Sequence, residues 1–162
     1  MAEFISASQN DQEMYAILKE LSVTDAVLEK IADFTDEMVE EIYSFAYAYY
    51  GEGSYKEAET IFRVLTALRI KSPKYWKGLG ATFQMQKKYE EAIESYGWAA
   101  LHDNSFLDPY PHFHAAECLY SSGNIPKALM ALRSAEAVAK KNSFQSLLAQ
   151  IRYLQKIWKE QK

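Results

Sequence analysis

Two small clusters in the sequence contain residue types that bind metal ions or nucleotides. His112, His114 and Cys118 lie close together, and His114 and Cys118 are four residues apart, on one face of a predicted helix. A structural zinc site needs four ligands, and no fourth ligand is nearby. The Gly-Leu-Gly run at 78–80 resembles the start of a dinucleotide-binding loop, but it lacks the third glycine and a preceding strand. We therefore expect no metal, no cofactor and no enzyme activity.

Tyrosines at helical spacing carry a different kind of chemistry. Tyr43, Tyr47 and Tyr50 fall within about 60° of one another around a helix. Tyrosines that line a groove suit an extended apolar peptide, because the ring packs and the hydroxyl bonds to backbone groups. A stripe of aromatic residues is also a common core feature. In that case the N-terminal helices or a partner subunit cover the three rings.

Helical hairpins that repeat along the chain must position these tyrosines. Residues 73–104 carry large and small side chains at the spacing of a tetratricopeptide repeat (TPR), a hairpin of two helices named A and B. Ala92, in KYEEAIESY, has counterparts 34 residues earlier at Ala58 and 36 residues later at Ala128. This period predicts three hairpins, which span about 39–72, 73–106 and 109–142.

The predicted fold is all-α: a curved solenoid of three tandem TPR helix hairpins, between N-terminal helices and a C-terminal capping helix. Three repeats are about the minimum number that bury a continuous core. The predicted parts are an N-terminal helical segment (1–34), the repeats (35–142) and the capping helix (143–162). A two-residue insertion interrupts the period near Phe106 and Leu107. Apolar residues of the N-terminal segment are candidates for capping the first repeat or for dimerisation: Ile17, Leu18, Leu21, Val27, Leu28 and Ile31.

Stacked hairpins curve, and their A helices form the concave face. The groove positions of the three repeats are Glu40, Tyr43, Tyr47 and Tyr50; Lys74, Lys77, Ala81 and Gln84; and Tyr110, Phe113, Glu117 and Tyr120. The positions expected to pack inside the first hairpin are Ile42, Phe45, Ala46 and Tyr49. The groove tyrosines therefore form a separate face, and we expect this groove to take an apolar peptide.

Composition agrees with one soluble, intracellular domain. The chain has 162 residues, of which 49% are hydrophobic, and a single cysteine, which excludes an internal disulfide. No secretory signal or membrane-spanning run is expected. Residues 1–41 contain eleven acidic and two basic residues, so this front segment is either solvated or packed on a basic surface. No basic run with interleaved aromatics points to nucleic acid.

Three segments resemble a known family. The runs IYSFAYAYYGEGSYKEAETIFRVL, YWKGLGATFQMQKKYEEAIESYGWAA and PYPHFHAAECLYSSGNIPKAL look like the class II chaperones of type III secretion systems, the LcrH/SycD-like group. The segment PHFHAAECL, residues 111–119, is the most characteristic, because generic TPR similarity would not fix it. The resemblance covers about residues 35–140, and the first 34 residues match poorly.

The resemblance implies a bacterial cytoplasmic chaperone that keeps hydrophobic translocator proteins unaggregated and unassembled before secretion. Its concave groove would take a client segment of P-x-L-x-x-P type, and Tyr43 and Tyr50 correspond to groove tyrosines of the family. Members often form homodimers through the N-terminal helices, and some assist an AraC-type transcription factor.

Repeats that clamp the acidic tails of heat-shock proteins have Lys and Asn where this chain has Tyr43 and Tyr47. A TPR adaptor or scaffold, or a transcriptional co-regulator without a secreted client, is the alternative.

Overall fold

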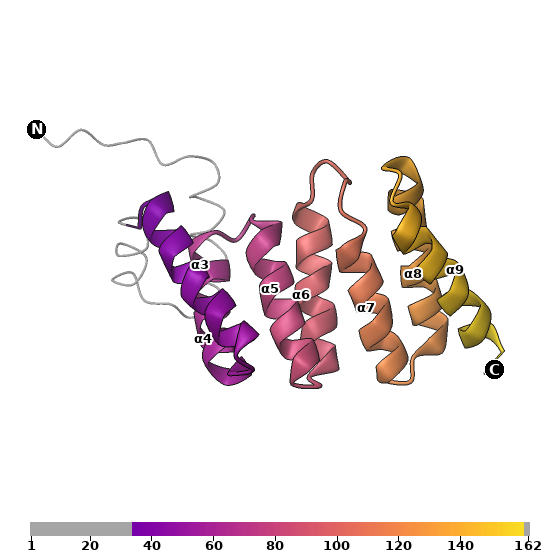
Figure 1. Cartoon of the computed structure of the whole chain (residues 1–162), viewed down its shortest axis with the longest axis horizontal. Coiled ribbons are helices and arrows are strands. Elements are labelled where there is room, and N and C mark those ends of the chain that lie inside the picture. The colour runs from indigo at the N-terminus through magenta and orange to yellow at the C-terminus, as the bar shows by residue number, and fades with distance from the viewer. Residues whose placement is uncertain (1–33, 161–162) are drawn as a thin grey trace, which may run out of the picture.

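The computed structural model describes residues 34–160, and most of this part of the chain is helical (Figure 1). The elements in chain order are α3 (Asp36–Gly51), α4 (Tyr55–Leu68), α5 (Pro73–Met85), α6 (Tyr89–His102), α7 (Tyr110–Ser121), α8 (Ile125–Lys141) and α9 (Gln145–Lys159). No strand occurs among the described residues. The prediction of an all-α solenoid is confirmed.

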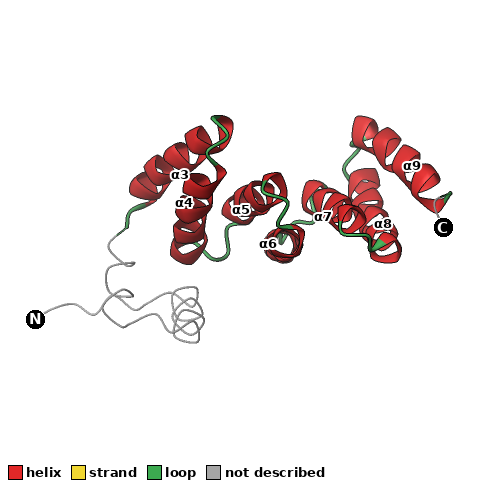
Figure 2. Cartoon of the chain, turned by 90° about the horizontal axis from the view of Figure 1, so that it is seen from below, coloured by secondary structure: helices red, strands yellow, loops and turns green. Residues whose placement is uncertain are grey.

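Successive helices pair as hairpins, and the hairpins stack side by side into an arc. The pairs are α3 with α4, α5 with α6, and α7 with α8, while α9 packs on α8. Figure 2 shows that α3, α5 and α7 lie on the inner side of the arc, and that α4, α6 and α8 lie on its outer side. The inner helices are therefore the ones that face a groove.

Local sequence signals explain several helix boundaries. The Thr35 hydroxyl accepts a hydrogen bond from the Met38 amide at the start of α3, and the Asn124 side chain accepts one from Lys127 at the start of α8. The turns inside the first and third hairpins contain Gly53 and Gly123, whose φ angles are +81° and +84°. Glycine adopts this left-handed conformation without a steric penalty, so the chain can reverse sharply there.

Two glycines of α5 let its neighbours approach closely. A Cβ atom on Gly80 would lie 2.9 Å from the Tyr96 ring of α6, and one on Gly78 would lie 2.1 Å from the Phe62 ring of α4. Both distances are too short for a side chain. The Gly-Leu-Gly run that resembles a nucleotide loop is therefore a packing feature of the helix.

The outer side of α3 differs from the prediction. Of the four residues expected inside the first hairpin, Ala46 is buried and Ile42 is partly buried, but Phe45 and Tyr49 are 63% and 38% exposed. The prediction for Phe45 and Tyr49 is wrong because the main contacts of α3, with α4 and α5, leave these two side chains exposed. With Met38, which is also exposed, they form the outer stripe of α3, within about 40° of one another.

The N-terminal helical segment predicted for residues 1–34 lies outside the described residues, apart from Phe34. The same holds for its candidate capping or dimerisation residues, Ile17, Leu18, Leu21, Val27, Leu28 and Ile31. The described chain enters α3 at Phe34, which packs against the first core cluster. Its carbonyl accepts a hydrogen bond of 2.8 Å from the Arg69 guanidinium, which also pairs with Asp36. This contact ties the start of the described chain to the end of α4.

Candidate functional site

A pocket with a volume of about 480 Å³ opens on the inner side of the arc. Side chains of α3, α5 and α7 supply most of its lining, and α4 and α6 each contribute one aromatic ring. The lining residues are Tyr43, Tyr47, Tyr50, Phe62, Lys74, Lys77, Gly78, Ala81, Gln84, Met85, Tyr96, Tyr110, His114 and Glu117. The pocket thus crosses all three hairpins.

The structure brings together most of the residues that the sequence assigned to a groove. Those lining the pocket are Tyr43, Tyr47, Tyr50, Lys77, Ala81, Gln84, Tyr110 and Glu117. Lys74 lines it too, whereas Glu40 stands beside it and pairs with Lys74. Helical spacing on three separate helices was therefore enough to find this set.

Phe113 and Tyr120 lie elsewhere. Phe113 is 6% exposed and belongs to the second core cluster, with Ala128 and Leu132 of α8. The Tyr120 ring stacks on Trp158 of α9, with a centroid distance of 4.3 Å and an interplanar angle of 7°. The capping helix thus covers the end of the third repeat, and these two aromatic residues support the core rather than the pocket.

Some lining residues were not predicted, because they come from positions assigned to hairpin packing. Phe62 belongs to α4, an outer helix, but reaches the pocket because Gly78 has no side chain to block it. Tyr96 fills the hairpin as expected, yet its hydroxyl also donates a hydrogen bond of 2.8 Å to Gln84 on the groove side. The glycine at position 80, against which the Tyr96 ring packs, is the sequence signal that could have predicted that Tyr96 reaches the groove. Gly78, Met85 and His114 complete the unpredicted set.

The first-hairpin end of the pocket is built around Tyr43. Its ring centroid lies 6.1 Å from Tyr47, 6.2 Å from Phe62 and 5.7 Å from Tyr75. The Lys74 ammonium stands 3.8 Å above the same ring, within the range of a cation–π interaction. Tyr43 is thereby held in place from several sides. Tyr47, in contrast, is 64% exposed, so its ring is accessible to a ligand in the groove.

The two lysines of the lining are both paired with carboxylates. Lys74 lies 2.5 Å from Glu40, and Lys77 lies 2.5 Å from Asp108. Hydrogen bonds from Lys74, and then from Tyr75, lower the pKa of Glu40 below its ordinary value. Glu40 is therefore ionised at neutral pH and balances Lys74. This pairing makes the groove a poor clamp for a carboxylate tail, as the sequence predicts.

A short polar network forms the third-hairpin end of the pocket. The Gln84 amide donates to Glu117 at 3.4 Å, and the Glu117 carboxylate lies 2.8 Å from Nδ1 of His114. The His114 ring also stacks against Tyr110, with centroids 5.9 Å apart. Burial raises the pKa of Tyr96, which keeps its hydroxyl protonated as the donor to Gln84. The pocket therefore has an aromatic end and a hydrogen-bonding end.

The His and Cys cluster is not arranged as a metal site in the described part of the chain. No group of three or more His, Cys, Asp or Glu side chains there is placed to hold a metal ion. Cys118 is fully buried, and burial raises the pKa of its thiol to about 12, so it is not a reactive thiolate. Across residues 34–160, no helix combines the length and apolar character needed to cross a membrane.

The arrangement suits an extended apolar segment. A curved pocket with aromatic walls can bury apolar side chains, while Gln84, Glu117 and the tyrosine hydroxyls can bond to a peptide backbone. The paired lysines add little free charge. The structure therefore agrees with the chemistry expected from the tyrosine stripe.

Comparison with known proteins gives the same fold. The family model for the tetratricopeptide repeat matches residues 39–71 and 73–101. The low calcium response locus protein H of Yersinia pestis is 35% identical over 129 residues, which is 79% of this chain and 74% of that protein.

Two similar solved structures contain a bound partner. The Yersinia enterocolitica type III secretion chaperone SycD, in complex with a peptide of the translocator YopD, has a TM-score of 0.73 and 31% identity, covering 80% of this chain and 98% of that one. PcrH of Pseudomonas aeruginosa, in complex with the chaperone-binding region of PopD, has a TM-score of 0.75 and 29% identity, covering 80% and 96%. With 35% identity across three quarters of its Yersinia pestis relative, this chain belongs to the class II chaperones of type III secretion, the LcrH/SycD-like family.

Proposed function

We propose that this chain is a bacterial cytoplasmic chaperone that binds hydrophobic translocator proteins through its concave pocket before they are secreted. The relatives SycD and PcrH were each solved with a translocator peptide or chaperone-binding region bound. The observation that carries the proposal here is the aromatic pocket across the three hairpins, with exposed Tyr47 and anchored Tyr43 at one end.

The mechanism is stoichiometric binding, without a chemical reaction. An extended client segment of P-x-L-x-x-P type lies across α3, α5 and α7, with its apolar side chains between the tyrosine rings. Burial of one leucine contributes about 2 kcal/mol. While it is bound, the segment is unavailable for aggregation or for premature assembly with another translocator. Release follows at the secretion apparatus.

The binding residues in this proposal are Tyr43, Tyr47, Tyr50, Lys77, Ala81, Gln84, Tyr110 and Glu117. Tyr43 and Tyr47 supply aromatic faces for apolar side chains, and Gln84 and Glu117 supply hydrogen-bonding groups for the client backbone. Phe113 and Tyr120 belong to the second core cluster and are not among the binding residues of this proposal.

The N-terminal segment has a place to act in this proposal. The outer stripe of α3, formed by Met38, Phe45 and Tyr49, is exposed in the structure. We place the apolar face of residues 1–34 on this stripe, either within one chain or between two chains of a homodimer. Sedimentation of the full chain, with and without Phe45→Ser, distinguishes these cases, because only a dimer interface changes the mass.

The proposal is tested by measuring aggregation of a purified translocator such as PopD when it is diluted from denaturant. We expect this chain to suppress light scattering with a sharp endpoint near one chaperone per client, because the described hairpins together form one concave pocket. Scattering unaffected at any ratio would contradict the proposal and favour a TPR adaptor. A regulatory role through an AraC-type factor would instead appear as binding of that factor by the client-free chain alone.

A further inference from the structure

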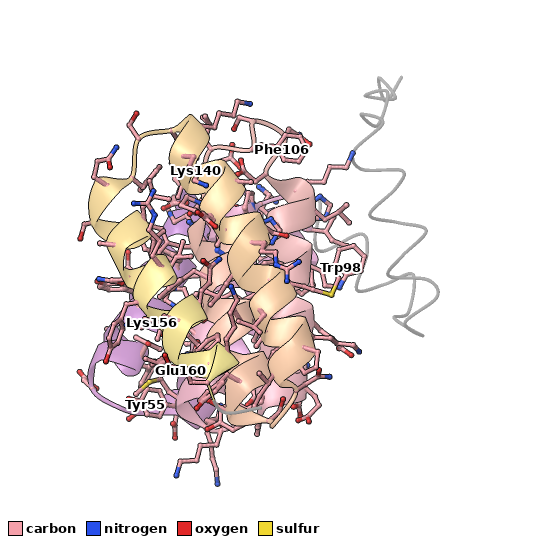
Figure 3. The ribbon with its side chains drawn as sticks, turned by 90° about the vertical axis from the view of Figure 1, so that its right-hand side faces the viewer. Tyr55, Trp98, Phe106, Lys140, Lys156 and Glu160 are labelled. Carbon is pink, nitrogen blue, oxygen red and sulfur yellow. The ribbon has the colours of Figure 1, made fainter. Side chains whose placement is uncertain are left out.

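The connection between α6 and α7, residues 103–108, exposes two large apolar side chains. Phe106 is 63% exposed and Leu107 is 52% exposed. Figure 3 shows Phe106 at the upper end of the molecule, away from Tyr55 at the lower end. These residues coincide with the two-residue insertion that interrupts the repeat period.

The loop is ordered by its own hydrogen bonds. The Asp103 carboxylate accepts from the backbone amides of Leu107 and Asp108, both at 2.9 Å, and from the Ser105 hydroxyl at 3.0 Å. The Phe106 carbonyl accepts a hydrogen bond of 3.1 Å from Asn142, the residue that ends α8. The exposed side chains are therefore presented by a fixed backbone.

Phe106 also has a strained backbone. Its φ angle is +49°, in the left-handed region that a bulky side chain rarely adopts. Such strain persists where surrounding contacts impose it, and it concentrates at sites of function. Asn or Gly would take this conformation more easily, so stability does not explain the phenylalanine.

The loop adjoins the pocket. Asp108, at its end, pairs with Lys77 of the pocket lining, and Tyr110, two residues further on, lines the pocket as well. A peptide chain that leaves the pocket beside Lys77 and Tyr110 meets this loop next. The occupant that follows from this continuity is another part of the same client.

We propose that Phe106 and Leu107 form a second client contact, which binds an apolar segment next to the one held in the groove. This inference rests on the proposed function and deepens it: the groove recognises a short motif, and the loop covers part of the apolar sequence that flanks it. The chemistry expected of the flanking segment is aliphatic or aromatic, because Phe106 and Leu107 offer no charge or side-chain hydrogen bond.

The test uses three labelled peptides. One is a P-x-L-x-x-P peptide, and the other two carry in addition a short leucine–alanine run at the N-terminus or at the C-terminus. Each is titrated against the wild-type chain, the double variant Phe106→Asn with Leu107→Ser, and the control Met130→Ser. Met130 is 63% exposed, as Phe106 is, but lies on the outer helix α8.

We expect the wild-type chain to bind one extended peptide about tenfold more tightly than the short one, as partial burial of two apolar side chains predicts. The double variant should bind the short peptide as tightly as the wild type does, but it should not bind the extended peptide more tightly. Met130→Ser should keep the tighter binding of the extended peptide. The melting temperature of Phe106→Asn should be equal or higher, because asparagine accepts a positive φ.

Three results would overturn the inference: no gain for either extended peptide, a gain that survives in the double variant, or a double variant that changes the oligomeric state of the free chain. The last would make the loop an interface between copies. If the wild-type chain fails to bind even the short peptide, the proposed function itself fails and the second contact falls with it.

Discussion

Tyr43 and Tyr47 lie one helical turn apart on α3, but their surroundings give them different roles. Tyr43 contacts Phe62, Tyr75 and Lys74, so it belongs both to the pocket wall and to the packing beneath it. Tyr47 is 64% exposed, and its ring centroid lies 6.1 Å from that of Tyr43. Tyr47 is therefore the residue whose replacement separates binding from stability.

Tyr47→Ala should weaken binding of a P-x-L-x-x-P peptide by about tenfold, while the free energy of unfolding changes by less than about 0.5 kcal/mol. Tyr43→Ala should weaken binding as well, but lower the free energy of unfolding by about 2 kcal/mol. Peptide titration and urea denaturation measure the two effects. The matched control is Tyr153→Ala on α9, since Tyr153 is equally exposed at 64%. Equal binding losses for Tyr47→Ala and Tyr153→Ala would exclude Tyr47 from the site.

Gly78 tests why α5 approaches α4 so closely. A methyl group there would lie 2.1 Å from the Phe62 ring, which in turn lines the pocket. Gly78→Ala should lower the free energy of unfolding by about 1–3 kcal/mol. Gly97→Ala should raise it by about 0.5–1 kcal/mol, because position 97 has no atom within 4 Å of the added methyl and alanine favours a helix. Denaturation of both variants measures this difference, and destabilisation by Gly97→Ala instead would contradict the packing account.

Among the elements, the loop 103–108 depends on one ionised side chain. Partial burial raises the pKa of Asp103, but hydrogen bonds from the Asp108 amide, the Ser105 hydroxyl and the Leu107 amide together lower it below the ordinary value. A carboxyl whose pKa is depressed in the folded state contributes stability above its unfolded pKa, and loses it as the pH falls through the folded pKa. The loop should therefore be intact at neutral pH and open only below about pH 4.

This opening can be followed by NMR through the amide shifts of Leu107 and Asp108. Both should move together, with a midpoint below the ordinary aspartate value of about 3.9, while far-UV circular dichroism stays constant. Asp108 and His112 are ionisable side chains close to Asp103 in the structure, so Asp103→Asn is the control and should remove the transition. A midpoint at or above the ordinary value would show that the carboxylate does not hold the loop.

At the scale of the whole molecule, the repeat period carried most of the information. Ala58, Ala92 and Ala128 are all fully buried, because a small residue at each of these positions lets two helices meet. Helical spacing within the same repeats placed nine of the twelve predicted groove positions around one pocket. Family membership, first suggested by PHFHAAECL, is confirmed by the comparisons.

Other features depend on contacts that no short pattern encodes. The predicted groove includes Tyr120 of the third repeat, but Trp158 of α9 stacks on that ring and draws it into the core. Phe45 and Tyr49 fit a hairpin pattern, yet the main contacts of α3, with α4 and α5, leave these two side chains exposed. The backbone of the loop at Phe106, with its positive φ, is held by hydrogen bonds to Asp103 within the loop and by one from Asn142, 36 residues further along the chain. The packing at the two ends of the solenoid and the conformation of the loop could therefore be learned only from the structure.

The central claim is that the concave pocket recognises an apolar client segment, and fluorescence-polarisation titration tests it most directly. A labelled P-x-L-x-x-P peptide is compared with the same peptide carrying alanine in place of leucine. The account predicts saturable binding that weakens by at least about tenfold without the leucine, since burial of that side chain contributes about 2 kcal/mol. Equal binding of both peptides, or of neither, would contradict it.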